Sequence, residues 1–79
     1  MDAKQAAAER IQELCRQRDL NINLLAKMSQ ISSSTIYSML SGKSRNPGII
    51  TIQLICNGLG ITVREFFDDP IFENLENVI

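Results

Sequence analysis

The sequence predicts an all-α fold, in which five helices form a compact domain and a short helical tail follows. Three observations lead to this prediction. Apolar residues recur at helical spacing in successive segments, no segment alternates apolar and polar residues as a strand would, and capping residues or glycines bound the helical segments. With 79 residues, 44% of them hydrophobic, the chain is long enough for one small domain and too apolar to be disordered.

The first predicted helix spans residues 3–18, which are rich in strong helix formers, and Asp2 is a suitable N-cap for it. Its inward stripe should consist of Ala7, Ile11, Leu14 and Cys15. We interpret this helix as a support for the segment that follows.

The segment from Asn21 to Gly42 is predicted to form two short helices joined by a tight turn. Asn21 caps the first of them and Ser32 caps the second, which should stop at Gly42. The residues expected to face inward are Leu25, Ala26 and Met28, then Ile36, Met39 and Leu40. The turn should hold Ser29, Gln30 and Ile31. This is the helix-turn-helix pattern, in which the second helix is presented to a DNA major groove.

A fourth helix is predicted from about Ile49 to Gly58, and Gly60 ends it. Its inward residues should be Ile52, Ile55, Cys56 and Leu59. Thr62 and Glu65 fit a capping box that opens a short fifth helix, from which Phe66 or Phe67 should fill the core.

The last ten residues form an apolar tail. Asp69 and Pro70 fit the N-cap and first position of another helix. In that helix an amphipathic stripe would consist of Ile71, Leu75, Val78 and Ile79. We therefore divide the chain into a domain over residues 1–69 and a tail over residues 70–79. Since so short a helix needs a surface, the tail packs on its own domain, contributes to a dimer interface, or frays.

Composition excludes several classes of function. The chain has no histidine and two cysteines, which rules out a disulfide framework and the usual zinc sites, so no metal and no cofactor are predicted. We expect Cys15 and Cys56 to be reduced core residues of a cytoplasmic protein. No apolar run approaches the roughly 20 residues that span a bilayer, so no membrane association is expected. An enzyme is not expected, because the serines lack a histidine base, and so small a domain has little room for a small-molecule ligand.

Charge is divided unevenly along the chain. Seven basic and four acidic residues lie in 1–47, whereas one basic and five acidic residues lie in 48–79. A domain with this division can offer one face to phosphate and turn the other away, although a chance distribution of solvated charges would look the same. The positive half is modest, so binding of DNA by one monomer should be weak and sensitive to salt.

From about Ala8 to Phe67 the chain resembles the phage-repressor-like (Cro, or xenobiotic-response-element) helix-turn-helix domains. The resemblance rests on the ordered spacing of Ile11, Leu14, Leu20, Leu25-Ala26, Ile31-Ser32, Thr35-Ile36, Gly42-Lys43, Pro47, Leu59-Gly60-Ile61-Thr62 and Glu65-Phe66. It implies a five-helix domain that binds operator DNA as a homodimer and represses transcription.

The resemblance also implies site residues. Those expected to read bases are Ser33, Ser34 and Ser38, with Tyr37 close by. Those expected to contact phosphates are Asn21, Asn23, Thr35, Lys43, Ser44, Arg45 and Asn46. Serine hydroxyls both donate and accept, so they read base edges less sharply than a bidentate arginine or glutamine. Capping and solubility alone would also account for the serine run. Tyr37 would equally fit an exposed helical tyrosine without a role.

Some residues depart from the family pattern. Gln30 stands where the family usually has a glycine in the turn, so it is expected to adopt a positive φ. Ile22 stands in place of a phosphate-contacting glutamine, which leaves that contact to Asn23. Cys15 and Leu40 replace a buried arginine–glutamate pair, which predicts a repacked core.

Two functions follow from these patterns. The first is a sequence-specific DNA-binding transcriptional regulator, a repressor that acts as a dimer on double-stranded DNA. The alternative is a protein-interaction module that keeps the helix-turn-helix fold and has lost DNA binding, which the acidic C-terminal half and the apolar tail favour.

Overall fold

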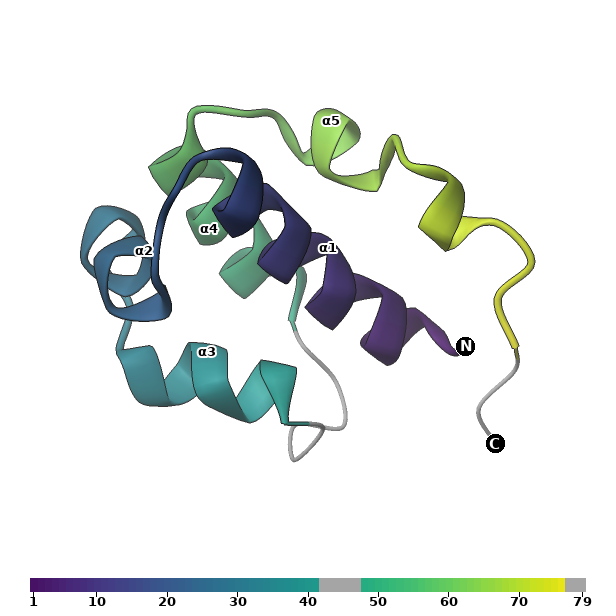
Figure 1. Ribbon diagram of the computed structural model, residues 1–79, viewed down its shortest axis with the longest axis horizontal. Helices are drawn as coiled ribbons and strands as arrows, with labels where there is room; N and C mark the ends of the chain where they lie inside the picture. Colours follow the sequence, from purple (N-terminus) through teal and green to yellow (C-terminus); the bar gives the residue numbers. More distant parts are fainter. Residues whose placement is uncertain (42–47, 77–79) are drawn as a thin grey trace.

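The computed structural model describes residues 1–41 and 48–76, and within them the regular secondary structure is helical, apart from one isolated bridge between Asp2 and Glu76. The elements in chain order are α1 (Ala3–Gln17), α2 (Ile22–Ser29), α3 (Ser33–Leu40), α4 (Ile49–Leu59), α5 (Val63–Phe67) and the single 3₁₀ turn η1 (Pro70–Phe72). Figure 1 shows α1 in the middle of the bundle, with α3 along one edge of the view and α5 and η1 along the opposite edge. The all-α, five-helix prediction is confirmed.

Local side-chain chemistry fixes where four of the five α-helices begin, whereas α4 begins after Gly48 without a side-chain cap. Asp2 and Gln5 form a reciprocal capping box at the start of α1, and Thr62 and Glu65 form another at the start of α5. Asn21 and Ser32 cap α2 and α3 by accepting hydrogen bonds from Leu24 N and Thr35 N respectively. These caps satisfy backbone donors that a helix leaves unpaired in its first turn.

The core collects the apolar stripes of all five helices. Its fully buried members include Ile11, Leu25, Ile36, Ile55 and Phe66, each with no exposed surface. Of the two candidate phenylalanines, Phe66 fills the core, whereas Phe67 is 39% exposed and packs edge-on against it. Cys15 is buried and Leu40 is half-buried against the core, which agrees with the apolar packing expected at these two positions.

One inward residue of α2 was predicted wrongly. Met28 is 42% exposed, and Ser29 is buried in its place. The reason lies in α4, where Gly58 faces α2 so closely that a Cβ there would lie 2.5 Å from Ser29 Oγ. Only a small side chain fits at this crossing, so α2 is rotated with Leu25, Ala26 and Ser29 towards the core.

The end of the chain also differs from the predicted amphipathic helix. Helical structure stops at Phe72, Glu73 is extended, and Asn74 adopts a left-handed conformation with a φ of 60°. Glu76 then donates a backbone hydrogen bond to the Met1 carbonyl at 3.0 Å. The described part of the tail therefore packs back on α1, whereas Val78 and Ile79 lie outside the described residues.

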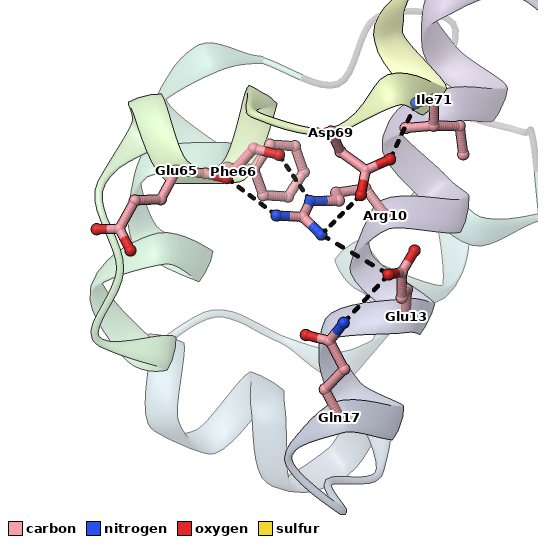
Figure 2. A network of polar contacts seen from close by, with 7 residues as sticks. All are labelled: Arg10, Glu13, Gln17, Glu65, Phe66, Asp69 and Ile71. Carbon is pink, nitrogen blue, oxygen red and sulfur yellow. Dashed lines mark hydrogen bonds and ion pairs between the residues drawn. The ribbon is translucent and has the colours of Figure 1, made fainter.

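A buried arginine holds this C-terminal part of the chain to α1 (Figure 2). Arg10 is 8% exposed, and its guanidinium donates to the Phe66 carbonyl at 2.7 Å and the Glu65 carbonyl at 2.9 Å. It also pairs with the Asp69 carboxylate at 3.3 Å. Asp69 in turn accepts from Ile71 N at 2.9 Å, which starts η1. One side chain thus supplies donors to the last carbonyls of α5 and a counter-charge to the tail.

Candidate nucleic-acid interface

Helix α3 turns one side to the core and leaves the opposite side open. Ile36 and Met39 are buried, and successive residues are rotated by about 100° around a helix, so Ser34, Tyr37 and Ser38 lie on the side away from them. Ser34 and Tyr37 are exposed, Tyr37 by 52%, and Ser38 is half-buried. We call Ser34, Tyr37 and Ser38 the outer face of α3. It carries hydroxyl groups and one aromatic ring, and no charge.

The other two hydroxyl residues of α3 lie on its flanks. Ser33 is half-buried, and Thr35 is exposed on the opposite flank. The Thr35 hydroxyl lies 2.8 Å from the Ser32 hydroxyl, so it is part of the N-terminal cap. The structure therefore places three of the four predicted base-reading residues on one face and sets Ser33 beside it.

The start of α2 presents two of the predicted phosphate-contacting residues. Asn21 and Asn23 are both exposed. The Asn21 side-chain oxygen accepts from Leu24 N at 2.8 Å, which directs its oxygen into the cap and leaves the amide hydrogens to donate outward. Lys43, Ser44, Arg45 and Asn46, the remaining predicted phosphate contacts, lie outside the described residues, as does Gly42, the predicted end of α3.

The turn between α2 and α3 has the backbone that the sequence predicted. Gln30 has a φ of 58° and a ψ of 37°, in the left-handed region. Ile31 N donates to the Ala26 carbonyl at 3.1 Å, which ends α2 and redirects the chain into α3. A residue other than glycine in this conformation carries strain of about 1 kcal/mol, which the surrounding helix packing must offset.

The electrostatic surroundings of α3 are sparse. The nearest basic residue along the chain that the structure describes is Lys27, which is exposed in the last turn of α2. The acidic residues of the C-terminal half lie on α5 or after it, namely Glu65, Asp68, Asp69, Glu73 and Glu76. Figure 1 shows α5 along the opposite edge of the molecule from α3. The outer face of α3 is thus on a different side of the molecule from α5 and its acidic residues.

Both cysteines are buried thiols. Burial raises the pKa of Cys15 above its ordinary 9.0, an effect that nearby Arg18 partly offsets, and burial likewise raises the pKa of Cys56. Both groups are therefore neutral thiols near pH 7. No group of three or more histidine, cysteine, aspartate or glutamate residues within 1–41 and 48–76 could hold a metal ion. No helix in those ranges is long and apolar enough to span a membrane.

The sequence does not reveal two residues that hold helices together, Arg10 and Ser29. Arg10 was counted only as a surface charge, and nothing local in the sequence distinguishes it from Arg16 or Arg18. Ser29 was placed in the turn, although Gly58 inside a helical segment was a signal that another backbone approaches there. Both contacts join elements far apart in the chain.

Comparison with known proteins agrees with this geometry. No curated protein matches the chain significantly. The chain is similar to the prophage Lp1 protein 11, whose crystal structure matches with 38% sequence identity and a TM-score of 0.80, over 89% of this chain and 93% of that one. The model of the Cro/C1-type helix-turn-helix DNA-binding domain matches residues 10–70. With two exposed helix starts and an open hydroxyl face on α3, the chain belongs to this Cro/C1-type helix-turn-helix family of DNA-binding domains.

Proposed function

We propose that this protein is a sequence-specific transcriptional regulator, a repressor that binds operator DNA as a homodimer. The observation that carries the proposal is the outer face of α3. It is open, uncharged and made of short hydroxyl side chains around Tyr37. Such a face can approach a major groove closely, since the serines on either side of Tyr37 are short and the backbone there is not shielded by long side chains.

Within this proposal, Ser34 and Ser38 exchange hydrogen bonds with base edges, and Ser33 contributes from the flank. Tyr37 lays its ring against a thymine methyl group or a sugar. Single hydroxyls discriminate bases weakly, so DNA shape and the spacing of two half-sites supply much of the specificity.

The phosphate contacts come from two groups of residues. Asn21, Asn23 and Thr35 act at the starts of α2 and α3, where unpaired backbone N–H groups also favour anions. Lys43, Ser44, Arg45 and Asn46 supply the positive charge and further donors. In this arrangement residues 1–69 form the DNA-binding domain, and the described part of the tail, residues 70–76, lies against α1 and Met1.

The homodimer follows from the weak base discrimination of a single α3 helix. Two copies on two half-sites about one helical turn apart gain affinity and specificity that one copy lacks. A dimer seated on an operator blocks access of the transcription machinery to that DNA, which is repression by occupancy.

Selection of bound sequences from a random DNA pool at low salt tests the proposal. We expect a paired motif with half-sites about one helical turn apart. Replacing Lys43 and Arg45 together with glutamate should abolish retention of DNA. Failure of the wild-type chain to enrich any sequence would support the alternative, a protein-interaction module, as would unchanged retention by the double variant.

A second experiment addresses the reading residues. Ser34→Ala should weaken binding to the selected site by about 2–10-fold, the range of one hydrogen bond, and relax the motif at one position. Gln17→Ala is the matched control, because Gln17 is exposed at the far end of α1 and bonds to Glu13. Equal effects of the two substitutions would contradict the assignment of α3.

A further inference from the structure

Helix α4 exposes isoleucines and no charged residue on its outer side. Its sequence, IITIQLICNGL, contains no charged residue. Ile49 is 58% exposed and Ile50 is 64% exposed, which makes them the most exposed large apolar residues in the described part of the chain. A solvated helix normally places charged residues opposite its buried stripe, and a helix apolar on several sides is normally covered.

The exposed residues of α4 form one continuous surface. With about 100° between successive residues, Ile50, Gln53 and Asn57 lie opposite the buried stripe of Ile52, Ile55 and Leu59. All three are exposed, Ile49 borders them, and Leu54 is half-buried at the edge. We call Ile49, Ile50, Gln53 and Asn57 the α4 face.

We propose that the α4 face binds the α4 face of a second copy of this chain, and that this contact forms the dimer. This inference rests on the proposed function only because that function also includes a dimer. The contact itself forms without DNA. A twofold axis brings each residue near the same set of residues on its partner, so a charged face would repel itself. The α4 face brings no charge to such an axis.

The polar residues of the face fit the same occupant. The side-chain amides of Gln53 and Asn57 both donate and accept hydrogen bonds, so they can pair reciprocally around an apolar centre of isoleucines. A charged peptide would find no counter-charge here. The four residues of the α4 face themselves offer no cation to a DNA phosphate, which would lie against isoleucine. The described part of the tail lies against α1 and does not cover α4.

The size of the face predicts a weak dimer. Eleven residues of helix are about 16 Å long, and one pair of such helices buries less than the roughly 1,200 Å² at which stable interfaces begin. The protein should therefore be mostly monomeric when dilute and dimeric when concentrated. Two half-sites on one DNA would supply the missing effective concentration. Because α3 immediately precedes the segment that leads to α4, pairing through α4 also fixes how far apart the α3 helices of the two copies lie.

Sedimentation equilibrium of the full chain without DNA, from low micromolar to near-millimolar concentration, tests the inference. The mass of the wild-type protein should rise from 8.9 kDa towards twice that value. Ile50→Glu and Asn57→Glu should each weaken the dimer by at least about tenfold. Ile50 is the second residue of α4, where the helix dipole favours an acidic side chain, so this variant should keep its fold, as circular dichroism will verify.

Leu24→Glu is the matched control, because Leu24 is 42% exposed on α2 and its replacement adds the same charge to another apolar surface site. It should leave the dimer unchanged. A wild-type chain that stays monomeric throughout, glutamate variants of α4 that dimerise normally, or an equal effect of Leu24→Glu would each overturn the inference. Binding to a half-site is measured on the same proteins. The inference is supported if Asn57→Glu loses self-association and still binds a half-site. If the wild-type chain self-associates but does not bind DNA, only the proposed function is contradicted.

Discussion

Replacing Gly58 with alanine tests whether the close crossing of α2 and α4 sets the position of the helix-turn-helix unit. A Cβ at Gly58 would lie 2.5 Å from Ser29 Oγ, 3.0 Å from the Met28 carbonyl carbon and 3.0 Å from Ser29 N. Two of these three atoms belong to the backbone of α2 and cannot rotate away. The added methyl group must therefore push α2 outward, away from α4.

The size of the effect follows from two opposing contributions. Overpacking of a tight core contact costs about 1–3 kcal/mol, and alanine in place of a helical glycine returns about 1 kcal/mol. Since backbone atoms are in contact, the upper part of the first range applies, and the net loss of stability should be about 1–2 kcal/mol. For a domain of this size that loss lowers Tm by roughly 4–16 °C.

Urea unfolding followed by far-UV circular dichroism measures the loss. Asn57→Ala, one position earlier on the exposed side of α4, is the control, and it should raise stability by about 0.5 kcal/mol through helix propensity alone. A Gly58→Ala protein as stable as wild type would refute the reasoning. A double-mutant cycle sharpens the test, because Ser29→Ala removes the nearest atom. In that background Gly58→Ala should be less destabilising by at least about 0.5 kcal/mol.

Three further outcomes are expected. Arg10→Met should destabilise the fold by about 2–4 kcal/mol in urea unfolding, because it leaves two carbonyls and Asp69 without their donor, whereas exposed Arg16→Met should change it by less than about 0.5 kcal/mol. Thr62→Ala should cost about 1 kcal/mol in the same assay, because it breaks the capping box of α5. Burial raises the pKa of the Cys15 and Cys56 thiols, so the folded state holds their protons longer than the unfolded state. Stability should therefore fall as pH rises above about 9, and the slope with pH should flatten when both are replaced by alanine. An unchanged slope in that variant would contradict the assignment.

The features predicted correctly from the sequence are those with a local cause. A capping residue acts on a backbone N–H two or three positions away, so Asn21, Ser32 and Thr62 could be identified from spacing alone. Gln30 could be assigned a left-handed conformation because the family that the chain resembles usually has a glycine at this place in the turn. The outer face of α3 follows from helical period once the inward residues are known.

The features that were missed depend on partners far away in the chain. The hydrogen-bond partners of Arg10 lie 55, 56 and 59 positions further along the chain, and no residue near Arg10 in the sequence indicates them. The inward direction of α2 depends on the absence of a side chain at Gly58. The tail follows an apolar period that suits a helix. Its course after Phe72 is set instead by contacts between Glu76 and the two residues that precede α1, Met1 and Asp2, which the apolar spacing of the tail does not reveal.

The distribution of charge makes a last prediction about how the proposed regulator holds DNA. Between Lys27 and Arg64 the sequence contains two charged residues, Lys43 and Arg45. Each phosphate that a lysine or arginine neutralises adds about −0.9 to the slope of log K against log salt concentration, so one copy on a half-site should show a slope near −2. Two copies on a full site neutralise twice as many phosphates, and the slope should approach −4. Filter binding over a range of salt concentrations measures both values. A half-site slope steeper than about −5 would mean that cations elsewhere, such as Arg16 and Arg18 at the end of α1, dominate the contact with DNA. The assignment of the main phosphate contacts to residues 43–46 would then be wrong.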